Sequence, residues 1–324
     1  MKTNKLTADI REIAYFLKRH LREDFQIYSY ALIGIFLGIC ISVNYLLDFE
    51  DSILDRYKSS SQGIFFYFLF YAFPYYTAVF ILQYFNKSET YLHKTEYWTK
   101  SLVCLLLLAM SSAIYPHESL LASLSSYDER YFITKIFSNI KKPLLFIPPF
   151  LLLSFYYDRT TQGIFGLKRN GFKYKPYLIL LILVLPFILL VSTQSEFLAT
   201  YPQFKAWKIT QVFGLKHWQM TFLYELVYSL DFILVEWFFR GALVIGLSRL
   251  MGHQAVLPMV CAYTFLHFGK PLEEALSSII GGYFLGVIAL YSRTILGGCL
   301  LHIGVALTMD LSALFQHSMQ GATH

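Results

Sequence analysis

The sequence predicts an all-α membrane protein, a polytopic bundle of about eight or nine transmembrane helices. Of its 324 residues, 56% are hydrophobic and only 15% are charged, whereas soluble domains carry about 25% charged residues. The hydrophobic residues also form long, nearly uncharged runs, which match the ~20 residues that a helix needs to cross a bilayer. Strands of a membrane barrel would instead alternate apolar and polar residues over ~10 positions, and the sequence shows no such alternation.

The hydrophobic runs define the predicted helices in chain order. Residues 5–22 repeat leucine and isoleucine at helical spacing between basic residues. This pattern is typical of an amphipathic helix that lies in the headgroup layer, and a cytosolic extension packed on the loops is the alternative. The predicted spans then cover residues 27–47, 63–85, 101–115, 143–157, 177–193, 220–247, 254–268, 272–291 and 294–315.

The chain is expected to divide into four segments. Residues 1–26 form the amphipathic extension, which lies on the cytoplasmic side or in the interface. Residues 27–218 form N-terminal transmembrane helices that are poor in ionisable groups. Residues 219–316 form a core that carries a buried polar site, and residues 317–324 form a tail.

The basic residues predict the orientation of the chain. With the N-terminus in the cytoplasm, the inside segments hold 16 lysines and arginines and the outside segments hold 10, as the positive-inside rule requires. The net charge of +6 therefore reflects topology, and it implies no nucleic-acid partner. The partner that this pattern implies is the lipid bilayer.

Ionisable side chains enter the hydrophobic runs of the last third of the chain. Each costs about 2.5–3.5 kcal/mol at the centre of a span, so each needs a partner or a function. Glu236 and Arg240 are four residues apart, on one face of a helix, and can neutralise each other. The other members are Glu225, Asp231, His267, His302 and Asp310.

Three of these residues are expected at similar depth in the membrane. Counted from the nearest cytoplasmic boundary, Glu236, His267 and His302 lie at heights of about 20, 21 and 14 Å. Two histidines and a glutamate at one level predict a zinc site with these three ligands or, without a metal, an acid–base set that activates water. A buried ion pair that only fixes helix packing is the alternative for Glu236 and Arg240.

Three segments in this region resemble a known family. They are VEWFFRG at 235–241, YTFLH at 263–267 and LHIGVA at 301–306. They are similar to the EExxxR, FxxxH and HxxxN motifs of the CAAX-protease and bacteriocin-processing (CPBP, Abi-type) intramembrane proteases, in the same order. The resemblance implies that Glu236 and His267 activate a water, that Arg240 holds Glu236, and that His302 binds a metal or stabilises the oxyanion. It leaves open whether the enzyme uses zinc or the carboxylate alone.

The motifs also depart from the family pattern. Val235 replaces the first glutamate and Ala306 replaces the asparagine, whereas Tyr263 in place of phenylalanine is a mild change. Asp231, one turn before Val235, and Glu225, on nearly the same helix face as Glu236, are candidates for the missing carboxylate. Asp310, about two turns beyond His302, is a candidate for the missing amide. Residues 267–275 and 306–310 resemble a bacterial subgroup of the family, which implies a bacterial inner (plasma) membrane.

We therefore predict a membrane-embedded peptidase that hydrolyses a membrane-associated peptide or protein. The alternative is a non-catalytic scaffold or immunity-type protein with the same fold, which Val235 and Ala306 favour. A transporter is a third hypothesis, because charges near the midplane can mark ion pathways. Transporters often carry internal repeats, and the sequence shows none.

Overall fold

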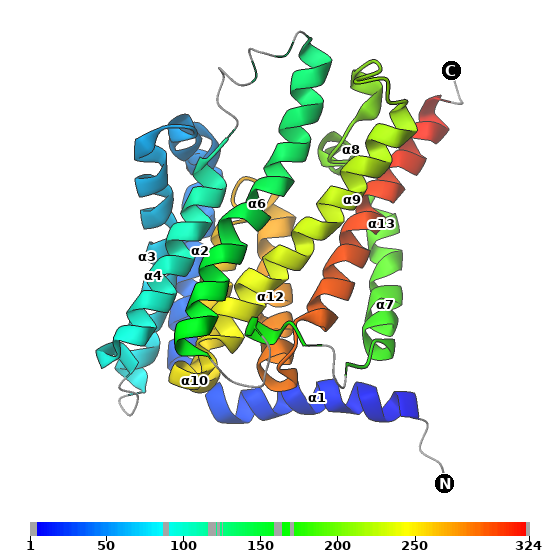
Figure 1. The fold of residues 1–324 in the computed structure, drawn as a ribbon. Helices are drawn as coiled ribbons and strands as arrows, with labels where there is room; N and C mark the ends of the chain where they lie inside the picture. The colour runs from blue at the N-terminus through cyan, green and yellow to red at the C-terminus, as the bar shows by residue number, and fades with distance from the viewer. Residues whose placement is uncertain are drawn as a thin grey trace. The chain divides into compact units, whose positions relative to one another are not determined.

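A computed structural model describes residues 5–86, 91–115, 121, 124, 126–158, 164–168 and 172–321. Throughout these ranges the regular elements are helices, which confirms the predicted all-α class. The principal α-helices are α1 Lys5–Asp24, α2 Ile27–Leu47, α3 Ser61–Phe85, α4 Thr95–Ala113, α6 Tyr127–Tyr157, α7 Lys175–Val191, α8 Ser195–Thr200, α9 His217–Glu236, α10 Ser248–Met251, α11 Val256–Phe265, α12 Leu272–Ser292 and α13 Leu296–Gly321 (Figure 1).

Among the residues that the structure describes, five helices are long and apolar enough to cross a membrane. They are α2, α3, α6, α12 and α13, while α7 is apolar but shorter. The helix α2 occupies the predicted run, because polar Gln26 and Asp48 flank an uninterrupted hydrophobic stretch. The chain is therefore an integral membrane protein, and the number of eight or nine spans stays a prediction.

The helix α6 is longer than the sequence predicted. The hydrophobic run at 143–157 is only its second half, because the helix begins at Tyr127 and has 31 residues. Its length of about 46 Å exceeds the ~30 Å hydrocarbon layer. Phe132 lies in the added turns and packs into a buried cluster with Phe204 and Tyr224, and this packing stabilises the helix before the hydrophobic run begins.

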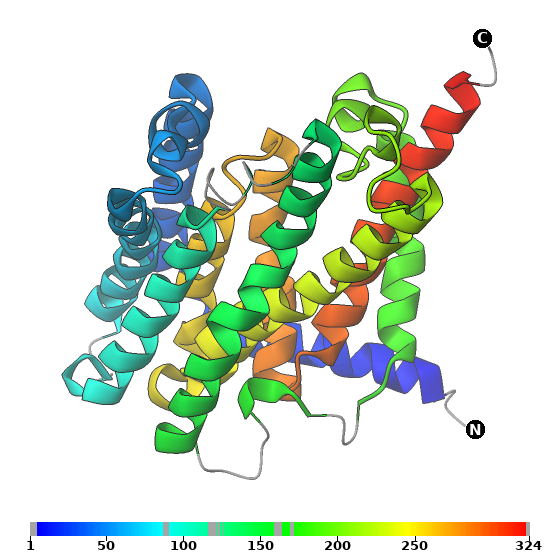
Figure 2. The ribbon, with the colours of Figure 1, turned by 45° about the horizontal axis from the view of Figure 1, so that its top comes forward.

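The chain divides into two compact units, which are described separately. The first contains 1–115, 144–172 and 236–296. Its centre is α11, whose ten residues are all buried, as expected for a helix that is hydrophobic all round. The helices α3 and α12 pack on α11, and α4 packs on α3 (Figure 2).

The amphipathic helix α1 belongs to the first unit. It contacts α12 and runs across the ends of the unit's long helices (Figure 1). One face is buried through Ile13, His20 and Asp24, and Asp24 accepts a hydrogen bond from Tyr30 at 2.6 Å and lies 2.7 Å from the ring of His253. The predicted helix is therefore present and packed on the protein. Its place in the headgroup layer stays a prediction.

The second unit contains 116–143, 173–235 and 297–324. Its core includes aromatic and aliphatic side chains from α6, α9 and the segment between α8 and α9. Gly297 is required by packing, since a Cβ there would lie 2.1 Å from the Tyr177 ring. Asp310, fully buried on α13, accepts hydrogen bonds from the backbone N–H of Gln203 and so holds the segment before α9.

Candidate functional site

A π-helical segment carries the FRG sequence. The helix α9 ends at Glu236, and the chain continues as a π-helix, η6, over Trp237–Ile245, in which every residue is buried. Such wide turns are rare and occur frequently at functional sites. The sequence predicted one continuous helix over 220–247, because hydrophobic periodicity does not distinguish a wide turn from an α-turn.

Gly241 is small because the chain approaches it closely. A Cβ at this position would lie 2.7 Å from the carbonyl oxygen of Phe165 and 2.9 Å from the Trp237 ring. The Trp237 indole N–H donates to the carbonyl of Ile164 at 3.0 Å, which holds the same short turn against η6. The glycine that follows Arg240 therefore serves packing.

Glu236 and Arg240 form the ion pair that their spacing predicts. An Oε1–Nη1 distance of 3.1 Å joins them, and their side chains are 0% and 1% exposed. At this depth each charge needs the other, because removing one partner of a buried pair leaves an uncompensated charge. The pair therefore fixes a carboxylate within the interior of the first unit.

Tyr263 connects this pair to His267. The Arg240 guanidinium lies over the Tyr263 ring at 4.3 Å from its centroid, a cation–π contact. The Tyr263 carbonyl lies 2.9 Å from Nδ1 of His267. A carbonyl only accepts hydrogen bonds, so Nδ1 must carry the proton, and Nε2 holds the lone pair of the neutral ring. His267 is therefore set up to accept a proton or bind a metal through Nε2.

The helix α11 ends at Phe265, so His267 lies in the turn that follows it, whereas the sequence predicted a helical span that continues to residue 268. The turn is anchored by two residues of α2 that the sequence did not single out. The Asn44 amide donates to the Phe268 carbonyl at 3.1 Å, and the Tyr45 hydroxyl donates to the Lys270 carbonyl at 2.7 Å. Asn44 was detectable as a polar side chain in a uniformly hydrophobic run.

His302 and the auxiliary acids belong to the second unit. The His302 ring lies 4.4 Å, between centroids, from the Phe232 ring, and Asp231 interacts electrostatically with His302. Asp231 also forms an ion pair with Lys142 of α6, a residue that the sequence placed in a loop. Glu225 interacts with Asp310, and the Asp310 carboxylate accepts a hydrogen bond from the backbone N–H of Gln203.

The structure thus joins Glu236, Arg240 and His267 through Tyr263 within one unit. The other unit contains His302, Asp231, Glu225 and Asp310. The roles of all seven as catalytic, auxiliary or metal-binding residues stay predictions.

Three carboxylates gather beside the His267 turn. Within the described ranges, Glu50, Asp51 and Asp55 offer oxygen atoms that all lie within 4.8 Å of one another. A Cβ on Gly269 would lie 2.5 Å from Glu50 Oε2. Burial and the neighbouring Asp55 carboxylate raise the pKa of Glu50 from 4.5 to about 8. Glu50 lies between α2 and α3, outside the spans.

This raised pKa predicts a pH-dependent stability. A carboxyl whose folded pKa is raised stabilises the fold fully below about 4.5, and this contribution is lost as the pH rises through about 8. Glu50→Gln should therefore melt like the wild type at pH 5 and at a higher temperature than the wild type at pH 9. Each ~1 kcal/mol of gained unfolding free energy raises the melting temperature by about 2–4 °C. Thermal unfolding at both pH values measures this, with exposed Glu196→Gln as the control. A difference that is the same at both pH values would contradict it.

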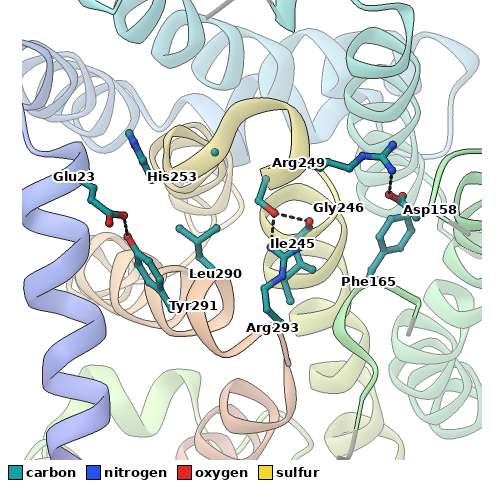
Figure 3. Close-up of a pocket in the computed structure, with 12 residues that line it drawn as sticks. Glu23, Asp158, Phe165, Ile245, Gly246, Arg249, His253, Leu290, Tyr291 and Arg293 are labelled. Atoms are coloured by element: carbon teal, nitrogen blue, oxygen red, sulfur yellow. Dashed lines mark hydrogen bonds and ion pairs between the residues drawn. The ribbon is translucent and has the colours of Figure 1, made fainter. Parts of the chain in front are cut away.

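A cavity of about 420 Å³ opens at the end of the first unit that α1 covers (Figure 3). Its lining includes Glu23, which accepts a hydrogen bond from Tyr291 at 2.8 Å, and Arg249, which donates to Glu96 at 2.6 Å. None of Glu236, Arg240 and His267 lines it. Because its charged groups bind one another and their neighbours, we assign this cavity no part in the candidate chemistry.

Residues 215–308 match the model of a family described as type II CAAX prenyl endopeptidase Rce1-like. The matched segment contains all three motifs, and so confirms the resemblance to CAAX proteases on the part of the chain where the motifs lie. No curated protein and no solved structure matches the chain. The match supports a membrane peptidase of the CAAX-protease kind.

Proposed function

We propose that the chain is a membrane-embedded peptidase that hydrolyses a peptide bond of a membrane-associated peptide or protein. The observation that carries the proposal is the series of contacts from Glu236 through Arg240 and Tyr263 to His267, inside the segment that matches the family. A positioned carboxylate and an oriented imidazole are both groups that can take a proton from water.

In the proposed reaction, a water oxygen attacks the carbonyl carbon of the peptide bond. The Glu236 carboxylate or Nε2 of His267 takes the proton of the water. The carbon–nitrogen bond of the tetrahedral intermediate then breaks, and the proton passes to the leaving amine. Arg240 keeps the Glu236 carboxylate in place, and we assign the developing oxyanion to His302 by the resemblance, because preorganised donors to an oxyanion are a large term in such reactions.

Zinc fits the donor types of the proposed site. Imidazole nitrogens and a carboxylate oxygen are its usual ligands in hydrolases, and the tautomer of His267 presents a lone pair on Nε2. The sequence assigns the ion to Glu236, His267 and His302, and a bound ion would polarise the scissile carbonyl. The residue roles above also stand for a metal-free carboxylate mechanism.

The proposed setting is a bacterial inner membrane, with the N-terminus in the cytoplasm. The bilayer and a membrane-associated peptide or protein are the proposed partners, and no nucleic acid is among them. A non-catalytic scaffold or immunity-type protein is the second candidate. Val235 and Ala306 favour it, because both are buried apolar side chains at positions where the family motifs place a carboxylate and an amide.

Cleavage of a membrane peptide by the purified protein in vesicles tests the proposal. His267→Ala should lower the rate by about 100-fold or more, the usual contribution of a general base. The matched control is His217→Ala, since His217 is exposed at the start of α9. A wild-type protein that cleaves, together with a His267→Ala variant of equal rate, would exclude this mechanism. A folded wild type that cleaves no peptide would favour the scaffold.

A further inference from the structure

A second cavity in the first unit is almost entirely apolar. It has a volume of about 610 Å³ and lies between α2, the turn after α2, α3 and the end of α11. Its walls include Ile39 and Cys40 of α2, Leu69 and Phe73 of α3, and Phe268 beyond α11. This volume is within the ~300–1,000 Å³ range of ligand sites in proteins.

The mouth of the cavity is continuous with the surface that faces lipid. Ile39, Leu69 and Phe73 line the cavity and are also 59%, 47% and 56% exposed. They lie on α2 and α3, two of the helices that are long and apolar enough to span a membrane. Exposed apolar side chains of spanning helices contact hydrocarbon, so the medium at this mouth is the acyl-chain region of the bilayer.

Water is a poor occupant of this cavity. A buried water needs two to four polar partners, and the lining offers few. The side-chain N–H of Asn44 already donates to the Phe268 carbonyl at 3.1 Å. The side-chain oxygen of Asn44 accepts from the backbone N–H of Glu50 at 3.1 Å. Both polar ends of the Asn44 side chain are therefore committed to the protein.

We propose that the cavity binds one acyl chain of a bilayer phospholipid. The hydrophobic effect does not drive this step, because the chain leaves one hydrocarbon medium for another. Close dispersion contacts with the aromatic walls hold it instead. Phe265 and Phe268 line the cavity and flank His267 in the sequence. An acyl chain in the cavity therefore packs against the turn that carries His267. This consequence rests on the proposed function, whereas the binding itself does not.

Photocrosslinking from the acyl chain tests the binding. The full-length protein is reconstituted in phosphatidylcholine vesicles with a small fraction of lipid that carries a diazirine at the end of one chain. After irradiation and digestion, mass spectrometry locates the labelled residues. Phe265 and Phe268 are 5% and 4% exposed, so only a chain inside the cavity can label them. We expect labelling there, and labelling confined to exposed residues would overturn the proposal.

A matched pair of variants distinguishes the cavity from ordinary lipid contact. Ile39 and Ile35 lie on the same helix and are 59% and 60% exposed, but only Ile39 lines the cavity. Ile39→Trp should lower the labelling of Phe265 and Phe268 at least fivefold, and Ile35→Trp should leave it unchanged. Equal labelling in both variants would overturn the proposal. Melting in the same vesicles establishes that both are folded, and because no peptidase assay is used, failure here leaves the proposed reaction intact.

Discussion

Replacing Glu236 by glutamine should abolish peptide cleavage, with a rate loss of about 10³–10⁵-fold. The amide keeps the shape of the side chain and an oxygen that can accept from Arg240, which lies 3.1 Å away. It cannot take a proton from water, however, and it leaves Arg240 buried without its counter-charge. The loss therefore measures the chemistry of the carboxylate when the rate is expressed per folded protein. The measurement is single-turnover cleavage of a membrane peptide by the purified protein in vesicles.

The control for this variant is Glu273→Gln, which removes a carboxylate of the same type from the exposed first turn of α12. It should cleave at the wild-type rate. If Glu236→Gln also cleaves at that rate, Glu236 is a structural residue and the base lies elsewhere, with His267 as the next candidate and Asp231 after it.

Replacing Arg240 by methionine should destabilise the fold by about 3–5 kcal/mol. The variant leaves the Glu236 carboxylate fully buried without its cation, and it removes the cation–π contact with Tyr263. Burying an unpaired charge is among the largest penalties that a single substitution imposes. Denaturant or thermal unfolding in detergent measures this loss.

A double variant separates charge from packing. Glu236→Gln combined with Arg240→Met removes both charges, so it should recover most of the stability that Arg240→Met loses, while it stays inactive. The coupling in this double-mutant cycle reports the pair itself. A double variant that is no more stable than Arg240→Met would mean that the cost comes from lost packing of the arginine side chain.

The class of fold was predictable because composition and the long hydrophobic runs together determine it. A chain with so few charges and such long hydrophobic runs has to bury its backbone polar groups in helices. The limits of α2 were predictable because polar residues flank a uniform run. The ion pair of Glu236 with Arg240 was predictable because a buried charge needs a partner, and the helix places one four residues away.

Other parts of the site depend on contacts that no local pattern encodes. His267 bonds to a backbone carbonyl, which every residue has, so only the path of the chain selects Tyr263. Asn44 and Phe268 are 224 positions apart, and Lys142 and Asp231 are 89 apart. The early start of α6 depends on tertiary packing of Phe132, which overrides the local drop in hydrophobicity.

Gly241 shows that packing, and not catalysis, can require a residue of a sequence motif. The residue is needed because the Phe165 carbonyl occupies the space that a side chain would fill, and this steric demand is independent of turnover. A descendant of this chain that lost its catalytic carboxylate would still need the glycine, because the Phe165 carbonyl would still pack against this position. The glycine of the FRG triplet is thus a signature of architecture, and tests of activity should rely on Glu236 and His267.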